Sequence, residues 1–180
     1  MQKTVGVRLL IAFLIAEIVL LSSMVFVEVL YAVYPYPIRA TIEAAATETG
    51  VPSHVILSTI KVESNFKTDA VSPKGAIGLM QIMPATFAWV TNGSEEYDIY
   101  NAADNILVGA RYLAYLYEKY QNWDAVHAAY NAGDGAVDRW LTNDRYSKDG
   151  VLTDIPYPET ATYLRRVKFA KKIYTHLYFR

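Results

Sequence analysis

The sequence predicts an all-α protein in which a helical domain is preceded by a single N-terminal transmembrane helix. Between Leu9 and Val27, a stretch of 19 residues, Glu17 is the only charged residue. A helix of that length spans roughly 28 Å, close to the ~30 Å hydrocarbon core of a bilayer. Further along, apolar residues recur at helical spacing in segments that end at Gly or Pro residues. No segment shows the alternation of apolar and polar residues that is typical of a strand.

The flanks of the apolar segment predict its orientation. Lys3 and Arg8 precede it, which favours a cytoplasmic N-terminus and an outer location for everything after Val33. A cleaved signal peptide has an apolar core of about 7–15 residues and small residues at the cut. This run is longer and lacks a clean Ala-x-Ala. We therefore expect an uncleaved signal anchor, whereas cleavage would give a secreted protein.

Glu17 is an unusual residue for the middle of a membrane helix. A carboxylate at that depth costs about 2.5–3.5 kcal/mol on insertion scales. Two interpretations are open: a protonated or snorkelling side chain in a helix apolar enough to tolerate it, or a contact with a partner helix. The second interpretation would connect the anchor to envelope or secretion machinery.

Prolines mark the boundary between the anchor and the domain. The run Tyr34-Pro35-Tyr36-Pro37 cannot continue a helix. We therefore assign residues 1–36 to the anchor and linker, and residues 37–180 to one domain long enough for its own core.

Gly, Pro and helix-capping residues mark the ends of the helices expected in this domain. Gly50 suits a helix C-terminus, Ser53 an N-cap and Pro84 a first helical turn. After residue 141 we expect a loop rich in Asp, Ser and Gly. A short apolar helix or turn is expected at 75–82, and longer or clearer helices at 38–49, 53–64, 84–89, 102–120, 123–131, 136–141 and 159–178.

Composition excludes several function classes. With 17 Lys and Arg against 18 Asp and Glu, the net charge of −1 lacks the basic surplus that a nucleic-acid partner requires. There is no Cys, and the three His form no HExxH and no close pair for a metal. Neither a phosphate-binding loop nor a dinucleotide-binding Gly motif occurs. We expect no metal and no cofactor.

Glu63 stands on the otherwise apolar face of its expected helix. Ile56, Ile60 and Glu63 are spaced i, i+4 and i+7, so they share a face that should point inward. Burial and the negative end of the helix dipole both raise the pKa of a carboxyl. A carboxyl that stays protonated near neutral pH is suited to general acid catalysis. The alternative is that Glu63 snorkels off the helix end or pairs with Lys61 or Lys67.

Three separated blocks carry a family resemblance. The first contains Glu63-Ser64 and the run Gly78-Leu79-Met80-Gln81, the second is Ala128-Ala129-Tyr130-Asn131-Ala132-Gly133, and the third is Ile155-Pro156-Tyr157-Pro158-Glu159-Thr160. In this order they resemble the catalytic domain of the soluble lytic transglycosylases, which is related to goose-type lysozymes. The matching blocks together span most of residues 52–170.

The resemblance implies a lysozyme-like helical fold and cleavage of peptidoglycan at the β-1,4 bond between N-acetylmuramic acid and N-acetylglucosamine. It implies that Glu63 is the only essential acid and base, that Tyr130 lies beside it, and that neither metal nor cofactor takes part. The positions that match substrate-binding residues of the family are Ser64, Ser72, Gln81, Met83, Tyr130, Asn131, Glu159 and Tyr163.

The reaction implied by the family needs one carboxyl group, whereas most glycosidases use two. Protonated Glu63 would release the leaving oxygen, and ionised Glu63 would then accept the proton of the muramic C6 hydroxyl as its oxygen attacks C1. The product is a 1,6-anhydro ring, formed without water. Asp69, on the following loop, is the alternative second carboxylate but matches no family position.

Together these inferences predict a lytic transglycosylase held in a bacterial cytoplasmic membrane by one helix, with its catalytic domain on the outer side. The tether would raise its local concentration at the wall. The expected partners are peptidoglycan glycan strands, the membrane and envelope or secretion machinery, and no nucleic acid. Two alternatives stay open: a hydrolytic muramidase on the same scaffold, and a non-catalytic wall-binding or structural subunit of an envelope machine.

Overall fold

The computed structural model describes residues 2–179 and divides the chain into two compact units, one ending at Pro35 and the other beginning at Tyr36. The first unit consists mainly of helix α1 (Gln2–Val33). Within α1, the stretch Leu10–Val33 is long and apolar enough to cross a membrane, with a mean hydropathy of 2.6. No other helix among the described residues has this combination of length and composition.

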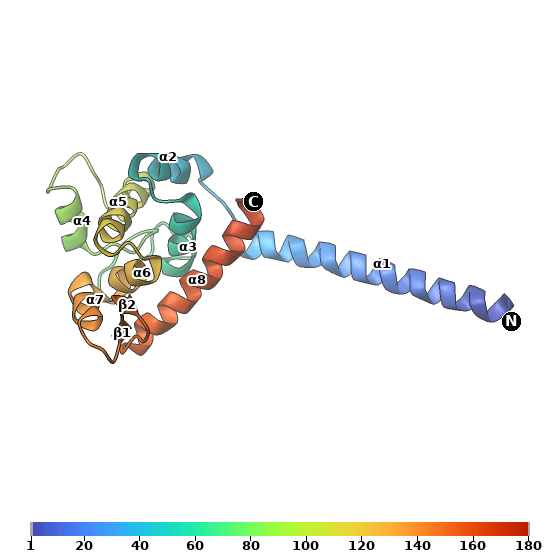
Figure 1. Ribbon diagram of the computed structural model, residues 1–180. Helices are drawn as coiled ribbons and strands as arrows, with labels where there is room; N and C mark the ends of the chain where they lie inside the picture. Colours follow the sequence, from blue (N-terminus) through green and yellow to red (C-terminus); the bar gives the residue numbers. More distant parts are fainter. Residues whose placement is uncertain (1, 180) are drawn as a thin grey trace. The chain divides into compact units, whose positions relative to one another are not determined.

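The second unit is built of helices with one small hairpin, which confirms the predicted all-α class (Figure 1). The expected helices are all present, and their ends differ from the expected ones by at most two residues. In chain order, its elements are α2 (Arg39–Thr49), α3 (Ser53–Glu63), α4 (Pro84–Val90), α5 (Ala102–Tyr120), α6 (Trp123–Ala132), α7 (Asp134–Leu141), β1 (Ser147–Lys148), β2 (Val151–Leu152) and α8 (Pro158–Tyr178).

Capping residues explain where several helices begin and end, and one of the expected caps is wrong. Gly50 closes α2 in the left-handed conformation, with φ 73°, as expected. The side chains of Asn101 and Asn122 cap α5 and α6, each accepting hydrogen bonds from two backbone N–H groups. The expectation that Ser53 caps α3 is wrong: Pro52 occupies the cap position, because its fixed φ suits the residue entering a helix, and Ser53 begins the helix itself.

The core of the second unit lies where α3, α5, α6 and α8 meet. Helix α8 runs beside α3, and α6 contacts α5, α7 and α8 (Figure 1). Ile106, Ala110 and Leu113, which recur at helical spacing, form the inward face of α5. This packing holds the end of α3 against the first half of α8. Fully buried apolar side chains from these helices include Ile56, Ile60, Ile106, Ala110, Leu113, Leu116, Val126 and Val167.

The hairpin formed by β1 and β2 corrects the expectation that the domain contains no strand. Ser147 pairs with Leu152 and Lys148 with Val151, and Asp149-Gly150 forms the turn. Both turn residues have positive φ, 51° and 75°. Asp-Gly favours two-residue hairpin turns, whose twist matches that of the strands. Each strand has only two residues, so its alternation is too short to recognise and the turn was the usable signal.

The segment 75–82 is a series of turns, which decides between the helix and the turn expected there. Ile77 forms isolated antiparallel bridges with Val71 and Ile82. Gly78 has a φ of 79°, which a regular helix does not allow. The segment therefore folds back on itself and forms a compact loop between α3 and α4.

Asn105, a buried residue in the first turns of α5, holds this loop in place. Its Oδ1 accepts a hydrogen bond from the Met80 N–H at 2.9 Å, and its Nδ2 donates to the carbonyls of Ile77 and Ile99, both at 3.0 Å. A Cβ added at Gly78 would come within 2.4 Å of the Asn105 Nδ2. Close approach and positive φ thus both require a glycine at position 78.

Candidate active site

Glu63 ends α3 at a pocket of about 200 Å³ in the second unit. Ile56 and Ile60 are fully buried on the same face of α3, as their spacing predicted, while Glu63 is partly exposed to the pocket. The structure brings all the predicted site residues to this pocket except Ser64 and Tyr163. The residues that line it are Glu63, Ser72, Lys74, Ala76, Gln81, Met83, Tyr130, Asn131 and Glu159.

The surroundings of Glu63 raise the pKa of its carboxyl from an ordinary 4.5 to about 7. The main cause is burial, because protein atoms packed around the carboxyl remove the water that stabilises its charged form. A hydrogen-bonding interaction with Tyr163 and the positive charge of Arg166 act in the opposite direction and lower the pKa. Burial prevails, and the carboxyl is about half protonated at neutral pH.

One face of α8 supplies the groups behind Glu63. Glu159, Tyr163 and Arg166 follow each other at i, i+4 and i+7 on this helix. Tyr163 is buried, and its hydroxyl interacts with the Glu63 carboxyl, although no well-formed hydrogen bond with any described residue satisfies it. Arg166 donates from Nη2 to the carbonyl of Val62 at 3.3 Å. The end of α3 is thus tied to α8 beside the carboxyl.

Two polar side chains of the loop after α3 are fixed at the pocket by the loop backbone. Ser72 Oγ accepts a hydrogen bond from the Ala76 N–H at 2.9 Å, which leaves its own hydroxyl proton for a ligand. Gln81 donates from Nε2 to the carbonyls of Ala70 at 3.0 Å and Gly78 at 2.9 Å. Since both amide hydrogens are used inside the loop, Gln81 offers a ligand its Oε1 as an acceptor.

The wall opposite the loop joins the end of α6 to the start of α8. Thr160 donates from Oγ1 to Asn131 Oδ1 at 2.8 Å, and Tyr130 donates from its hydroxyl to the Met80 carbonyl at 2.8 Å. Burial, and then the nearby charge of Glu63, raise the pKa of Tyr130 well above its ordinary value. Tyr130 and Glu63 therefore lie close together, with the Tyr130 hydroxyl engaged by the loop.

Lys74 and Glu159 add an exposed ion pair to the pocket, with 3.3 Å between Lys74 Nζ and Glu159 Oε2. Exposed pairs of this kind contribute about 0–1 kcal/mol, because water screens them and both side chains lose freedom. A ligand can therefore separate the pair at little cost. The pair also balances the charge of the second carboxylate that lines the pocket.

Other candidate residues and hollows lie away from this pocket. Ser64 is buried, and its hydroxyl donates back to the Ile60 carbonyl at 3.3 Å. Asp69 is exposed and does not line the pocket. A larger hollow of about 720 Å³, lined by residues of α2 and α5 such as Glu48 and Arg111, contains none of the predicted site residues. Among the described residues, no group of three or more His, Asp or Glu could hold a metal.

Sequence reasoning did not assign a role to three residues that the structure brings to the site or its support. Arg166 was given no role, although its spacing from Glu159 and Tyr163 was a usable signal. Lys74 lies inside the first family block and could have been considered with it. Asn105 gave no signal, because its partners are 25 to 28 residues away in the sequence or in an irregular segment.

Comparisons with known proteins match this arrangement to one family. The family model described as the transglycosylase SLT domain matches residues 40–152. The soluble lytic murein transglycosylase of Escherichia coli (strain K12) is 34% identical over 126 residues, which are 65% of this chain and 20% of the relative. The membrane-bound lytic murein transglycosylase C of Actinobacillus pleuropneumoniae serotype 5b (strain L20) is 32% identical over 160 residues, an alignment that covers 73% of this chain and 44% of the relative.

Solved structures agree with the sequence relatives. The lytic transglycosylase Slt of Pseudomonas aeruginosa, solved as an inactive mutant, superposes with a TM-score of 0.71 at 33% identity, over 79% of this chain and 24% of that one. The 70 kDa soluble lytic transglycosylase in complex with bulgecin A gives a TM-score of 0.76 at 28% identity, over 84% of this chain and 26% of that one. The chain thus spans between a fifth and less than half of the curated relatives it matches. Its second unit has the lysozyme-like fold of these enzymes, and the chain belongs to the transglycosylase SLT domain family.

Proposed function

We propose that this protein is a membrane-anchored peptidoglycan lytic transglycosylase with Glu63 as its acid and base. The observation that carries the proposal is a carboxyl with a pKa of about 7 in a pocket lined by residues that match the family motifs. The relatives named lytic murein transglycosylases support the reaction class. A solved relative that carries a Glu-to-Gln change and is described as inactive supports the choice of a glutamate.

The first step uses the protonated form of Glu63. Its carboxyl gives a proton to the oxygen between N-acetylmuramic acid and N-acetylglucosamine, and the bond from C1 to that oxygen breaks. The acetamido group of the substrate stabilises the positive charge that develops at C1. The raised pKa favours this step, because about half of the enzyme molecules hold the required proton at neutral pH.

The second step uses the ionised form of the same group. The C6 hydroxyl oxygen of the muramic sugar attacks C1, and the Glu63 carboxylate takes the hydroxyl proton. This restores protonated Glu63 and leaves a 1,6-anhydro ring, so no water is consumed. Tyr163 and Arg166 favour the ionised carboxylate and lower its pKa, which keeps burial from making the group too weak an acid for the first step.

The remaining polar groups of the pocket orient the sugar. Ser72 offers a hydroxyl proton, Gln81 an amide oxygen, and Asn131 an amide fixed by Thr160. Holding the C6 hydroxyl closer to C1 than any water molecule is a matter of positioning, which can contribute several kcal/mol to a reaction barrier. These side chains, with Met83 and Glu159, are the substrate-binding residues of the proposal.

The first unit supplies the anchor in this proposal. α1 has the length and composition of a membrane span, and one relative is named as membrane-bound. Lys3 and Arg8 before the apolar stretch favour a cytoplasmic N-terminus, and residues 37–180 would then form a catalytic domain outside the bacterial cytoplasmic membrane. Tethering raises the concentration of the enzyme at the wall.

Digestion of purified peptidoglycan with the full chain in a nonionic detergent tests the proposed reaction. We expect mass spectrometry to find muropeptides with anhydro-muramic ends, which are lighter by one water than reducing ends. Reducing ends alone would identify a hydrolytic muramidase on the same scaffold. Intact glycan strands, together with retained binding, would identify a non-catalytic wall-binding protein.

The pH dependence of cleavage follows from the raised pKa of Glu63. Because the free enzyme must be protonated for the first step, kcat/KM should fall as the pH rises through about 7. The variant Tyr163→Phe removes a group that lowers this pKa, so its falling limb should lie at higher pH than that of the wild type. Initial rates of glycan release between pH 5 and 9 measure the falling limb of each protein. Falling limbs at the same pH in the wild type and in Tyr163→Phe would contradict this role of Tyr163.

A further inference from the structure

Basic residues are concentrated at the end of the chain. Residues 160–180 contain six Lys or Arg and no Asp or Glu, although the whole chain has a net charge of −1. Most of these residues belong to α8, whose inner side packs against α3 and α6. An uneven charge distribution of this kind attracts a partner of opposite charge to one side of a protein.

The outer side of α8 combines positive charge with an exposed aromatic ring. Arg165, Phe169 and Lys172 follow each other at i, i+4 and i+7, and all three are exposed; we call them the α8 stripe. Phe169 is 59% exposed, whereas Val167 and Ala170 on the opposite side of the helix are buried. Helices that lie on membranes use Lys and Arg to meet lipid headgroups and Phe or Trp rings to enter the headgroup region.

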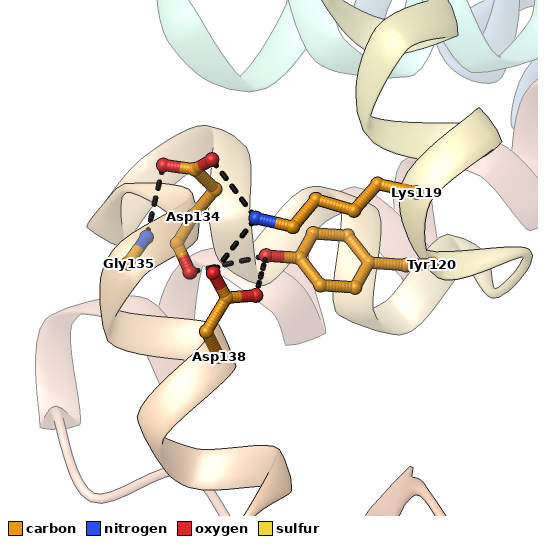
Figure 2. A network of polar contacts seen from close by, with 5 residues as sticks. All are labelled: Lys119, Tyr120, Asp134, Gly135 and Asp138. Carbon is orange, nitrogen blue, oxygen red and sulfur yellow. Dashed lines mark hydrogen bonds and ion pairs between the residues drawn. The ribbon is translucent and has the colours of Figure 1, made fainter.

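The cations of the α8 stripe are not neutralised within the protein, unlike others on the surface of the second unit. Figure 2 shows a neutralised cation: Lys119 Nζ lies 3.0 Å from Asp134 Oδ2 and 2.7 Å from Asp138 Oδ2. Within residues 2–179, neither Arg165 nor Lys172 forms an ion pair with an acidic side chain. Their charges can therefore act on an anionic partner outside the protein.

The chain enters the second unit beside the end of α8. The ring of Tyr36, the first residue of this unit, lies 5.4 Å from the ring of Tyr178 and 5.8 Å from that of Phe179. Lys172 stands six residues before Tyr178, which is roughly 9 Å along the helix. Tyrosines are enriched where proteins cross the membrane–water interface, so this aromatic cluster also suits a position close to lipid.

The link between the proposed membrane span and the second unit is short. The apolar stretch of α1 ends at Val33, and Tyr36 follows three residues later. Three residues reach at most roughly 11 Å even when fully extended. The attraction of an anionic membrane surface falls off within a Debye length, about 8 Å at physiological salt. The short link therefore keeps the end of α8 within reach of this attraction.

We propose that the α8 stripe docks the second unit on the anionic lipid surface of the membrane that holds α1. Arg165 and Lys172 contact lipid phosphates, and Phe169 between them enters the headgroup region. The start of the same helix carries Glu159 to the Glu63 pocket, so docking of α8 also fixes how the pocket is oriented towards the bilayer. This inference rests on the anchoring role of α1 in the proposed function.

A fluorophore beside the stripe tests the contact. The chain contains no cysteine, so a single introduced one is labelled uniquely. The full chain carrying Thr175→Cys with an NBD label, at an exposed position one turn from Lys172, is reconstituted into vesicles whose lipids carry headgroup quenchers. We expect stronger quenching when phosphatidylglycerol is mixed with phosphatidylcholine than in phosphatidylcholine alone. High salt should remove this difference, because it screens the attraction.

Variants of the stripe should separate its two components. The double variant Arg165→Gln/Lys172→Gln should lower the ratio of docked to undocked domains, read from the quenching, roughly 30-fold. Phe169→Ala should also weaken docking but leave its salt dependence unchanged, because the ring carries no charge. Each variant should cleave peptidoglycan in a nonionic detergent at the wild-type rate, which shows that the domain is folded.

Two controls match these measurements. Arg145→Gln/Lys148→Gln removes the same charge from two exposed positions at the hairpin and should leave the quenching unchanged. A label at Glu95→Cys, an exposed position in the loop after α4, should show no dependence on phosphatidylglycerol. Figure 1 shows α4 on the side of the second unit away from α8.

Other outcomes overturn the inference or the proposed anchor separately. Equal quenching in the two lipid mixtures, or equal losses in the stripe and hairpin variants, would contradict docking by the α8 stripe. A change in the fluorescence of the label with soluble polyphosphate, without a response to anionic vesicles, would assign the stripe to a soluble polyanion. Flotation of the unlabelled chain tests the anchor: a chain that floats with anionic vesicles but not with neutral ones would support the stripe and contradict the span.

Discussion

Replacing Glu63 by glutamine is expected to lower the rate of glycan cleavage at least roughly 10³-fold, while glycan strands still bind. General acid–base catalysis typically contributes about 10²–10⁴-fold, and here one group serves as acid in the first step and as base in the second. Glutamine has the same shape but can neither give up a proton to the leaving oxygen nor accept one from the C6 hydroxyl. Loss of both steps with retained binding would distinguish catalysis from positioning.

The measurement is the release of soluble fragments from purified peptidoglycan, with binding of the strands measured in parallel. Asp69→Asn is the matched control, because Asp69 is the nearest alternative carboxylate but is exposed and does not line the pocket. We expect this control to cleave at the wild-type rate. Equal losses in the two variants would favour a mechanism with two carboxylates, and a fully active Glu63→Gln variant would remove Glu63 from the reaction.

Stability measurements show whether the inactive variant is folded and also report on the pKa of Glu63. A carboxyl whose pKa is higher in the folded than in the unfolded chain stabilises the fold at low pH, and this stability is lost as the pH rises through the folded value. Moving the pKa from 4.5 to about 7 corresponds to up to about 3 kcal/mol. Glu63→Gln should therefore match the wild type near pH 4 and exceed it in free energy of unfolding above pH 7. If the free energy of unfolding of Glu63→Gln equals that of the wild type both near pH 4 and above pH 7, the raised pKa is contradicted.

The helices could be predicted from sequence because their signals are local. Apolar spacing places Ile106, Ala110 and Leu113 on the buried face of α5, and Gly50 ends α2 as its conformational freedom suggests. The hairpin was missed because each strand has only two residues. The Asp149-Gly150 turn was its only clear signal.

The candidate site was predicted less completely, and for a physical reason. The spacing of Glu63 after Ile56 and Ile60 indicates a carboxyl on an apolar face, and family motifs indicate the side chains around it. How far burial raises the pKa of Glu63 depends on α8, because Tyr163 and Arg166, about one hundred residues later in the chain, lower that pKa. No local pattern gives this pairing of α3 with α8.

A buried amide at the base of the site leads to the second large effect. Replacing Asn105 by alanine is expected to lower the free energy of unfolding by about 3–5 kcal/mol, because a buried polar group left without a partner costs about 1–3 kcal/mol. The change removes the acceptor for the Met80 N–H and the donor for the carbonyls of Ile77 and Ile99. The groups of Ile77 and Met80 belong to the turns that position Gln81, and the Met80 carbonyl accepts the hydrogen bond of the Tyr130 hydroxyl.

The free energy of unfolding can be measured by urea titration of the full chain in detergent, followed by tryptophan fluorescence. All three tryptophans lie in the second unit, so the signal reports on the domain and not on α1. Asn101→Ala is the matched control, since Asn101 lies one turn earlier, is exposed, and only caps α5. Its loss should cost about 1 kcal/mol and leave cleavage unchanged. Asn105→Ala should in addition reduce cleavage by the protein that remains folded, because the loop carrying Gln81 loses its support; equal costs for the two asparagines would show that the loop holds its shape without Asn105.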